Sequence, residues 1–206
     1  MTDEMPTEAV VEKALSDFRK LQGALGGDVV RLWSDAVDFY KEASSGKEGE
    51  PGRKSRLMRA AVFGAAAAFE STTNFLAEQV AARGRVGTRH LTETEADVLR
   101  EKRRILEEKG TIKQRKVLYS SKNRYLLLHR LISGGREYGK KAMGELTKSF
   151  TVRDRLVHPK PGASISDVPP EQFSAAVLGF FRADLILAAV WGKAGEDNPA
   201  ANRSAG

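Results

Sequence analysis

The chain has 206 residues, which suits one domain with a core large enough to fold without disulfides or structural metals. It contains no cysteine, which excludes a disulfide framework and a thiolate zinc site. Residues 1–12 are acidic and polar, unlike a secretory signal. The longest apolar stretch, residues 173–191, is broken by Arg182 and Asp184, which a membrane span seldom carries together. We therefore expect a cytoplasmic protein that does not engage a membrane.

The net charge of +7 is unevenly distributed along the chain. Residues 100–148 contain 15 Lys and Arg but only 5 Asp and Glu, a net charge of +10, whereas the remaining residues have a net charge of −3. A surplus confined to one segment favours a polyanionic partner, with nucleic acid as the first candidate. A solvated helix face rich in lysine would explain the same composition equally well.

Apolar residues recur at helical spacing along most of the chain, between breaks marked by Gly and Pro. This pattern predicts helices at residues 7–25, 28–43, 55–83, 92–109, 138–156 and 170–192, with a basic segment carrying an apolar stripe at 111–132. No alternating strand pattern of useful length is present, so the predicted class is all-α. We expect one domain over residues 1–193, with its core at about 55–193 and the helices of residues 7–43 packed on it, followed by a disordered tail at residues 194–206.

Two of these helices have distinctive sequences. Residues 60–69 are almost all small or apolar, which predicts close contact with other helices on several sides. Thr92 and Glu95 have the spacing of a capping box, so the charged helix at 92–109 is expected to start there.

The residue types best suited to catalysis lie in the stretch 151–160 (TVRDRLVHPK). Asp154 and His158 are four residues apart and share a helix face, so the carboxylate could orient the imidazole. On a regular helix Arg153 lies about 140° away from His158, but Pro159 pushes its predecessor out of helical geometry and frees it to turn toward the arginine. Alternatively, a second copy across a two-fold axis supplies another Arg and His. Either arrangement forms a small cationic cleft.

Such a cleft suits metal-independent cleavage of RNA. Histidine can remove the proton of the 2′-hydroxyl or protonate the leaving oxygen near neutral pH, and arginine binds phosphate with a planar, permanently charged group. One imidazole does not easily serve both proton transfers, which favours a homodimer. The alternative is a surface ion-pair cluster of Arg153, Asp154 and Arg155, with His158 interacting with the helix C-terminus, because so short a pattern recurs by chance.

Residues 153–158 (RDRLVH) resemble the Arg-polar-x-x-x-His signature of the HEPN superfamily, which comprises all-α proteins of prokaryotic conflict systems and RNA processing. The alanine-rich helix with Glu70 near its centre (AAAAFESTTNFL) also resembles many members. The resemblance extends in pattern over most of residues 58–191 and implies a HEPN-like antiparallel helical bundle. The charged helix at 92–109 would be an addition to the minimal family pattern.

In active members of that superfamily, Arg and His from two protomers form a metal-independent endoribonuclease site, while other members keep the fold without activity. By resemblance, Arg153 would bind phosphate and stabilise the transition state, His158 would transfer protons, and Asp154 would orient one of the two. No metal or other cofactor is implied.

Three further residues are candidates for substrate binding: Glu70, Arg155 and Lys160. Glu70 could pair with Arg153 in the cleft, or it could cap a polar pocket in the core with Thr73 and Asn74. Lys160 could contact the RNA backbone or simply be a solvent-exposed lysine.

His90 and His129 have no ligand partners at metal spacing and are expected to be surface or interface residues. The tyrosines of the basic segment, residues 119, 125 and 138, could stack on bases but are more often core residues.

The leading hypothesis is a homodimeric endoribonuclease that leaves a 2′,3′-cyclic phosphate, in the role of a toxin or phage-defence effector with an antitoxin or regulatory partner. The alternative is a non-catalytic module of the same fold that binds a protein or nucleic acid. A DNA-binding regulator is disfavoured because no compact helix-turn-helix pattern is found.

Overall fold

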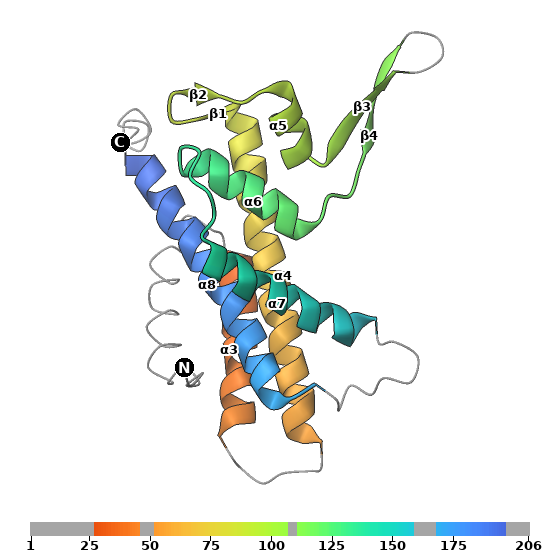
Figure 1. The fold of residues 1–206 in the computed structure, drawn as a ribbon, viewed down its shortest axis with the longest axis vertical. Coiled ribbons are helices and arrows are strands. Elements are labelled where there is room, and N and C mark those ends of the chain that lie inside the picture. The colour runs from red at the N-terminus through yellow and green to blue at the C-terminus, as the bar shows by residue number, and fades with distance from the viewer. Residues whose placement is uncertain (1–26, 46–51, 107–110, 159–167, 197–206) are drawn as a thin grey trace. The chain divides into compact units, whose positions relative to one another are not determined.

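The computed structural model describes residues 27–45, 52–106, 111–158 and 168–196, and this part of the chain is mostly helical (Figure 1). Its helices are α3 (Gly27–Ser44), α4 (Arg53–Arg83), α5 (Glu93–Leu99), α6 (Ser121–Ile132), α7 (Lys140–Val157) and α8 (Pro170–Glu196). Its strands are β1 (Arg85–Val86), β2 (Arg89–His90), β3 (Lys102–Leu106) and β4 (Ile112–Lys116). The strands form two antiparallel pairs, β1 with β2 and β3 with β4. The prediction of a helical protein is confirmed.

The chain divides into two compact units, which we describe separately. Unit 1 comprises Met1–Thr72 and Gly139–Ile186, and unit 2 comprises Thr73–Tyr138 and Leu187–Gly206. Helices α4 and α8 each contribute residues to both. Unit 1 contains 17 Lys and Arg against 17 Asp and Glu, whereas unit 2 contains 17 against 10. The whole net charge of +7 therefore belongs to unit 2.

Most predicted helices are confirmed. Those at residues 28–43, 55–83, 138–156 and 170–192 correspond to α3, α4, α7 and α8, with ends that differ by a few residues. Helix α8 continues to Glu196, so the tail predicted from residue 194 starts too early. The predicted helix at residues 7–25, the extended segment after His158 and the remainder of the tail lie outside the described residues.

The charged helix predicted at residues 92–109 ends at Leu99, and the prediction is wrong for residues 102–106. The capping box is present, since Thr92 Oγ1 accepts from the Glu95 N–H (3.2 Å) and Glu95 Oε2 accepts from the Thr92 N–H (2.9 Å). The helix then ends, Glu101 adopts a φ of 53°, and the hairpin β3–β4 follows. The expectation of no strands fails here because Lys, Arg and Leu are good helix formers, while strand formation depends on pairing with a second segment, here β4. The basic segment 111–132 likewise divides into β4 and α6.

Close packing along α4 confirms the expectation drawn from its alanine-rich centre. Its buried side chains recur at helical spacing and include Met58, Ala61, Val62, Ala65, Phe69 and Thr72. A Cβ added at Gly64 would lie only 3.1 Å from the Cβ of Ala36 on α3. Phe69 also packs against Phe150 of α7 and Phe180 of α8, with ring centroids 5.6 Å and 5.5 Å away. Small residues thus allow α3 to approach α4, and aromatic residues fill the space beside α7 and α8.

A fully buried carboxyl group joins three helices of unit 1. Asp184 Oδ2 on α8 accepts from Trp33 Nε1 on α3 at 2.8 Å and lies 2.9 Å from Thr72 Oγ1 on α4. The Thr72 hydroxyl is also 3.0 Å from the carbonyl oxygen of Ala68, and a hydroxyl has only one proton to donate. A protonated Asp184 satisfies both contacts, because the carboxyl then donates to Thr72 while Thr72 donates to Ala68. Burial raises the pKa of Asp184 to about 8, against the opposing effect of the hydrogen bond that the Trp33 indole donates.

This pKa predicts a pH-dependent stability. The folded-state pKa of about 8 exceeds the ordinary value of 3.8, so between these values the folded protein holds a proton that the unfolded chain has released. The free energy of unfolding should therefore fall as the pH rises through this window, by up to about 1.4 kcal/mol per pH unit from this group alone. In Asp184→Asn, whose side chain stays neutral, that part of the slope should disappear. Urea unfolding of the wild type and of Asp184→Asn, between pH values near the two pKa values, measures the free energy of unfolding of each. If this free energy depends on pH in the same way in both proteins, Asp184 does not carry the proton.

Helix α7 crosses α8 at a glycine. A Cβ at Gly179 would lie 2.1 Å from Ser149 Oγ and 3.0 Å from the carbonyl oxygen of Glu145, so no larger side chain fits without movement. Ser149 itself is buried, and its hydroxyl donates to the same carbonyl at 3.0 Å.

We expect Gly179→Ala to lower the free energy of unfolding by about 1–3 kcal/mol, because it overpacks this crossing. Gly144 provides a matched control on the exposed side of α7, since a Cβ there meets nothing within 4 Å. Gly144→Ala should raise the free energy of unfolding by about 0.4–1 kcal/mol, because it restricts the unfolded chain. Denaturant unfolding measures both, and equal effects of the two substitutions would contradict the close crossing.

Unit 2 is organised around a buried arginine. Arg124 of α6 donates from Nη1 to Asn74 Oδ1 on α4 (2.6 Å) and from Nη2 to the carbonyl oxygen of Leu99 at the end of α5 (2.8 Å). Its Nη1 also lies 3.2 Å from Glu101 Oε1. The neighbouring Tyr125 is fully buried, which confirms the core interpretation for this tyrosine. Part of the basic segment therefore serves the interior of unit 2.

One helix segment, Glu171–Trp191 of α8, is long and apolar enough to cross a membrane by length and composition alone. The core helix of a folded domain meets the same criterion, and 61% of the segment is buried within the structure.

Candidate active site

The RDRLVH stretch ends α7 in unit 1, and the amphipathic pattern of that helix decides which side chains are available. Val152 and Leu156 are buried at a four-residue interval and hold the helix against the core. Arg153 is half-buried beside them, while Asp154 and Arg155 are exposed. The polar residues of the stretch thus line the boundary between the core and solvent.

The guanidinium of Arg153 is held by two carboxylates. Nη2 donates to Glu70 Oε1 on α4 at 2.8 Å, and Nη1 donates to Asp154 Oδ1 at 2.8 Å. The side chains of Arg153 and Glu70 remain 29% and 32% exposed, so the pair is reachable from solvent. Of the two arrangements considered for Glu70, the structure shows the pairing with Arg153. Asn74, which belonged to the alternative arrangement, accepts a hydrogen bond from Arg124.

His158 lies at the C-terminal cap of α7 with φ −125° and ψ 68°, outside helical geometry, as expected for a residue that precedes proline. Its backbone N–H donates to the carbonyl oxygen of Asp154 at 2.8 Å, and its side chain is exposed. The Asp154 carboxylate is directed to Arg153. The structure therefore brings together Glu70, Arg153 and Asp154, and it connects His158 to them through the backbone of Asp154.

The other two candidates differ in what the structure describes. Arg155 is exposed in the last turn of α7, where a cation interacts favourably with the helix dipole. Lys160 lies outside the described residues.

The cluster leaves part of the Arg153 guanidinium available. Arg153 contacts two carboxylates, Glu70 and Asp154, at 2.8 Å each. Two of the five N–H groups of Arg153 are engaged by carboxylates, which leaves donors for a phosphate oxygen. The arrangement can orient a guanidinium and offer an exposed imidazole for proton transfer.

Among the described residues, no group of three or more His, Cys, Asp or Glu side chains is placed to hold a metal ion. No protein-family model matches the chain, and neither a curated protein nor a solved structure shows significant similarity to it.

Sequence reasoning missed two buried polar residues and misplaced a third. Asp184 organises unit 1 and Arg124 organises unit 2. The sequence offers a signal only for Asp184, because an Asp within an apolar helix is rare. His129 is buried, not a surface residue, and its ring lies 5.1 Å from that of Tyr138. Burial, with a smaller effect of Arg136, lowers the pKa of His129. His90 is exposed, as predicted.

The partial exposure of the Arg153–Glu70 pair predicts that it contributes little to stability. Glu70→Gln should change the free energy of unfolding by less than about 1 kcal/mol, which is typical of ion pairs near the surface. Glu145→Gln is the matched control, because Glu145 of α7 pairs with Arg182 of α8 at 3.0 Å with similar exposure. Thermal or urea unfolding measures both. A much larger destabilisation by Glu70→Gln alone would assign this pair a structural role in the core.

Proposed function

We propose that the protein is a HEPN-type, metal-independent endoribonuclease whose site contains Arg153 and His158. The observation that carries the proposal is the guanidinium of Arg153, oriented by Glu70 and Asp154 at the end of a helix where the side chain of His158 is exposed. A preoriented cation and an accessible imidazole are the two groups that phosphodiester cleavage by the 2′-hydroxyl requires.

In this reaction His158 of one protomer removes the proton of the ribose 2′-hydroxyl. The 2′-oxygen then attacks phosphorus, the bond from phosphorus to the 5′-oxygen breaks, and a 2′,3′-cyclic phosphate forms. An imidazolium supplies the proton that the leaving 5′-oxygen takes up. Arg153 stabilises the negative charge that accumulates on the non-bridging oxygens. Glu70 and Asp154 act as positioning residues for the guanidinium.

Two proton transfers favour a homodimer. A second copy of α7 provides the second imidazole, so that one acts as base and the other as acid. Such an enzyme needs only RNA as substrate, and uncontrolled cleavage would harm its host. We accordingly assign it the role of a toxin or phage-defence effector that an antitoxin or regulatory protein restrains.

The second candidate function is a non-catalytic module that binds a protein or nucleic acid. It is favoured by one observation: Arg153 is already engaged by two carboxylates within the same unit. A guanidinium neutralised in this way can serve as a surface ion pair, with His158 as a helix cap.

Incubation of the purified protein with single-stranded RNA in the presence of EDTA separates the two candidates. We expect cleavage products with 2′,3′-cyclic phosphate ends, and a decrease of about 100-fold or more in rate for His158→Ala and for Arg153→Ala, as removal of a general base or of a charge-stabilising donor usually causes. Unregulated expression of the wild-type protein should also slow growth, and expression of His158→Ala should not.

His90→Ala is the matched control, because His90 is exposed and lies outside the cluster. Its rate should equal that of the wild type. Glu70→Gln should lower kcat, whereas Glu145→Gln should not, although both remove a carboxylate that pairs with an arginine. Full cleavage by both His158→Ala and Arg153→Ala, or binding of RNA without turnover, would remove the proposed site and leave the non-catalytic module.

A further inference from the structure

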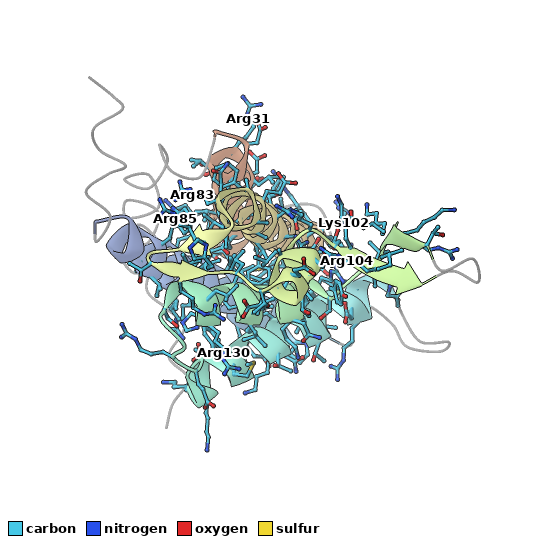
Figure 2. The ribbon with its side chains drawn as sticks, turned by 90° about the horizontal axis from the view of Figure 1, so that it is seen from above. Arg31, Arg83, Arg85, Lys102, Arg104 and Arg130 are labelled. Carbon is cyan, nitrogen blue, oxygen red and sulfur yellow. The ribbon has the colours of Figure 1, made fainter. Side chains whose placement is uncertain are left out.

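The hairpin β3–β4 of unit 2 is a strongly basic ribbon. Its two five-residue strands, KRRIL and IKQRK, contain six Lys and Arg and no Asp or Glu. Every residue of β4 is exposed, and Lys102 and Arg104 of β3, labelled in Figure 2, are exposed as well. Figure 1 shows the hairpin extending away from α5 and α6. This surface lies in the unit that carries the whole net charge of the protein and is separate in sequence from the RDRLVH stretch.

The register of the hairpin places like charges opposite each other. Lys102 is paired with Lys116, and Arg103 with Arg115. Like charges directly opposed across two strands destabilise a ribbon, and an isolated two-stranded hairpin is at best marginally stable. A sequence that keeps such a local conflict is expected where function requires the charges, because positions that violate a folding rule concentrate at functional sites.

The base of the hairpin is anchored within unit 2. Arg104 pairs with Glu93 at 2.5 Å and with Asp97 at 3.2 Å on α5. The backbone N–H of Val117 donates to the carbonyl oxygen of Glu101 at 2.8 Å, and Glu101 in turn contacts the buried Arg124. Arg104 thus serves as a structural anchor, while Lys102 and Lys116 are exposed on the two strands.

We propose that the β3–β4 hairpin binds the phosphodiester backbone of nucleic acid. Phosphates bring negative charge to the like-charged pair of Lys102 and Lys116 and relieve its repulsion. The strands contain no aromatic residue on which a base could stack, so recognition follows the backbone and tolerates any base sequence. The inference goes beyond the proposed cleavage, because it assigns a second surface in another unit. If the protein is a ribonuclease, this surface retains its substrate.

The test removes four positive charges from the hairpin and keeps its anchor, Arg104. Lys102, Lys113, Arg115 and Lys116 are all replaced by Gln in the full-length His158→Ala protein, so that RNA stays intact. The matched control removes the same charge from exposed positions of unit 1, by replacing Arg31, Lys54, Lys141 and Lys148 with Gln. Fluorescence anisotropy of a short labelled RNA at several salt concentrations measures affinity.

We expect the hairpin variant to bind at least tenfold more weakly and to show a shallower dependence of log K on log salt concentration. The slope should decrease by roughly 0.7 for each phosphate of a single strand that the variant no longer neutralises. The control should keep the wild-type slope, and a DNA strand of the same length should bind like the RNA. The thermal midpoint of the hairpin variant should be unchanged or higher, because repulsion is removed, and this verifies that it folds.

Equal affinity and equal salt slope for the hairpin variant and the control would overturn the inference. So would a hairpin variant that still binds RNA but no longer binds polyglutamate, because the ribbon would then serve an acidic protein. Binding is measured without the His158 side chain, so a failure of the proposed cleavage leaves this result readable. Conversely, the same hairpin substitutions can be made in a protein that retains His158. If that variant cleaves RNA with an unchanged KM, the binding role of the hairpin is rejected and the proposed cleavage stands.

Discussion

The hydrogen-bonded carboxyl group of Asp184 is the interaction on which the arrangement of unit 1 depends. It connects α8 to Trp33 of α3 and to Thr72 of α4, and its burial is tolerable because the carboxyl is protonated at neutral pH. Thr72 and Glu70 are two residues apart on α4, which places them about 200° apart around the helix axis. The contact that turns Thr72 toward Asp184 therefore also turns Glu70 toward α7, where it meets Arg153.

Charge and candidate chemistry are distributed between the two units. Unit 1 is neutral in sum and contains the Glu70–Arg153–Asp154 cluster, with His158 at the end of the same helix α7. Unit 2 carries the entire net charge, and the exposed hairpin concentrates six of its cations. Such a division would suit the proposed function. Diffuse positive charge attracts a polyanion over distance, whereas catalysis needs a few preoriented groups.

Residue type alone was a poor guide to the role of the charged and polar residues. Arg124 and Arg104 belong to the same basic segment, yet the first is buried as the centre of unit 2 and the second anchors the hairpin. His129 was expected at the surface or in an interface, and it lies against Tyr138 in the interior. In each case a partner outside the residue's own helix or strand decides the role, and no spacing pattern identifies that partner. The interpretation of Tyr125 as a core residue succeeded because a large aromatic ring usually finds burial.

The amino-acid sequence by itself determined four of the helices, the capping box at Thr92 and the non-helical backbone at His158, because helical periodicity, side-chain capping and the steric demand of proline act over a few residues. It also located the Arg153, Asp154 and His158 stretch and left two arrangements open for Glu70. Tertiary structure decided between those arrangements, buried Asp184, and converted the predicted end of a charged helix into a hairpin. Ion pairs, burial and strand pairing join residues on different elements, many of them far apart along the chain. Their energies depend on which surfaces meet after folding, and local sequence does not contain that information.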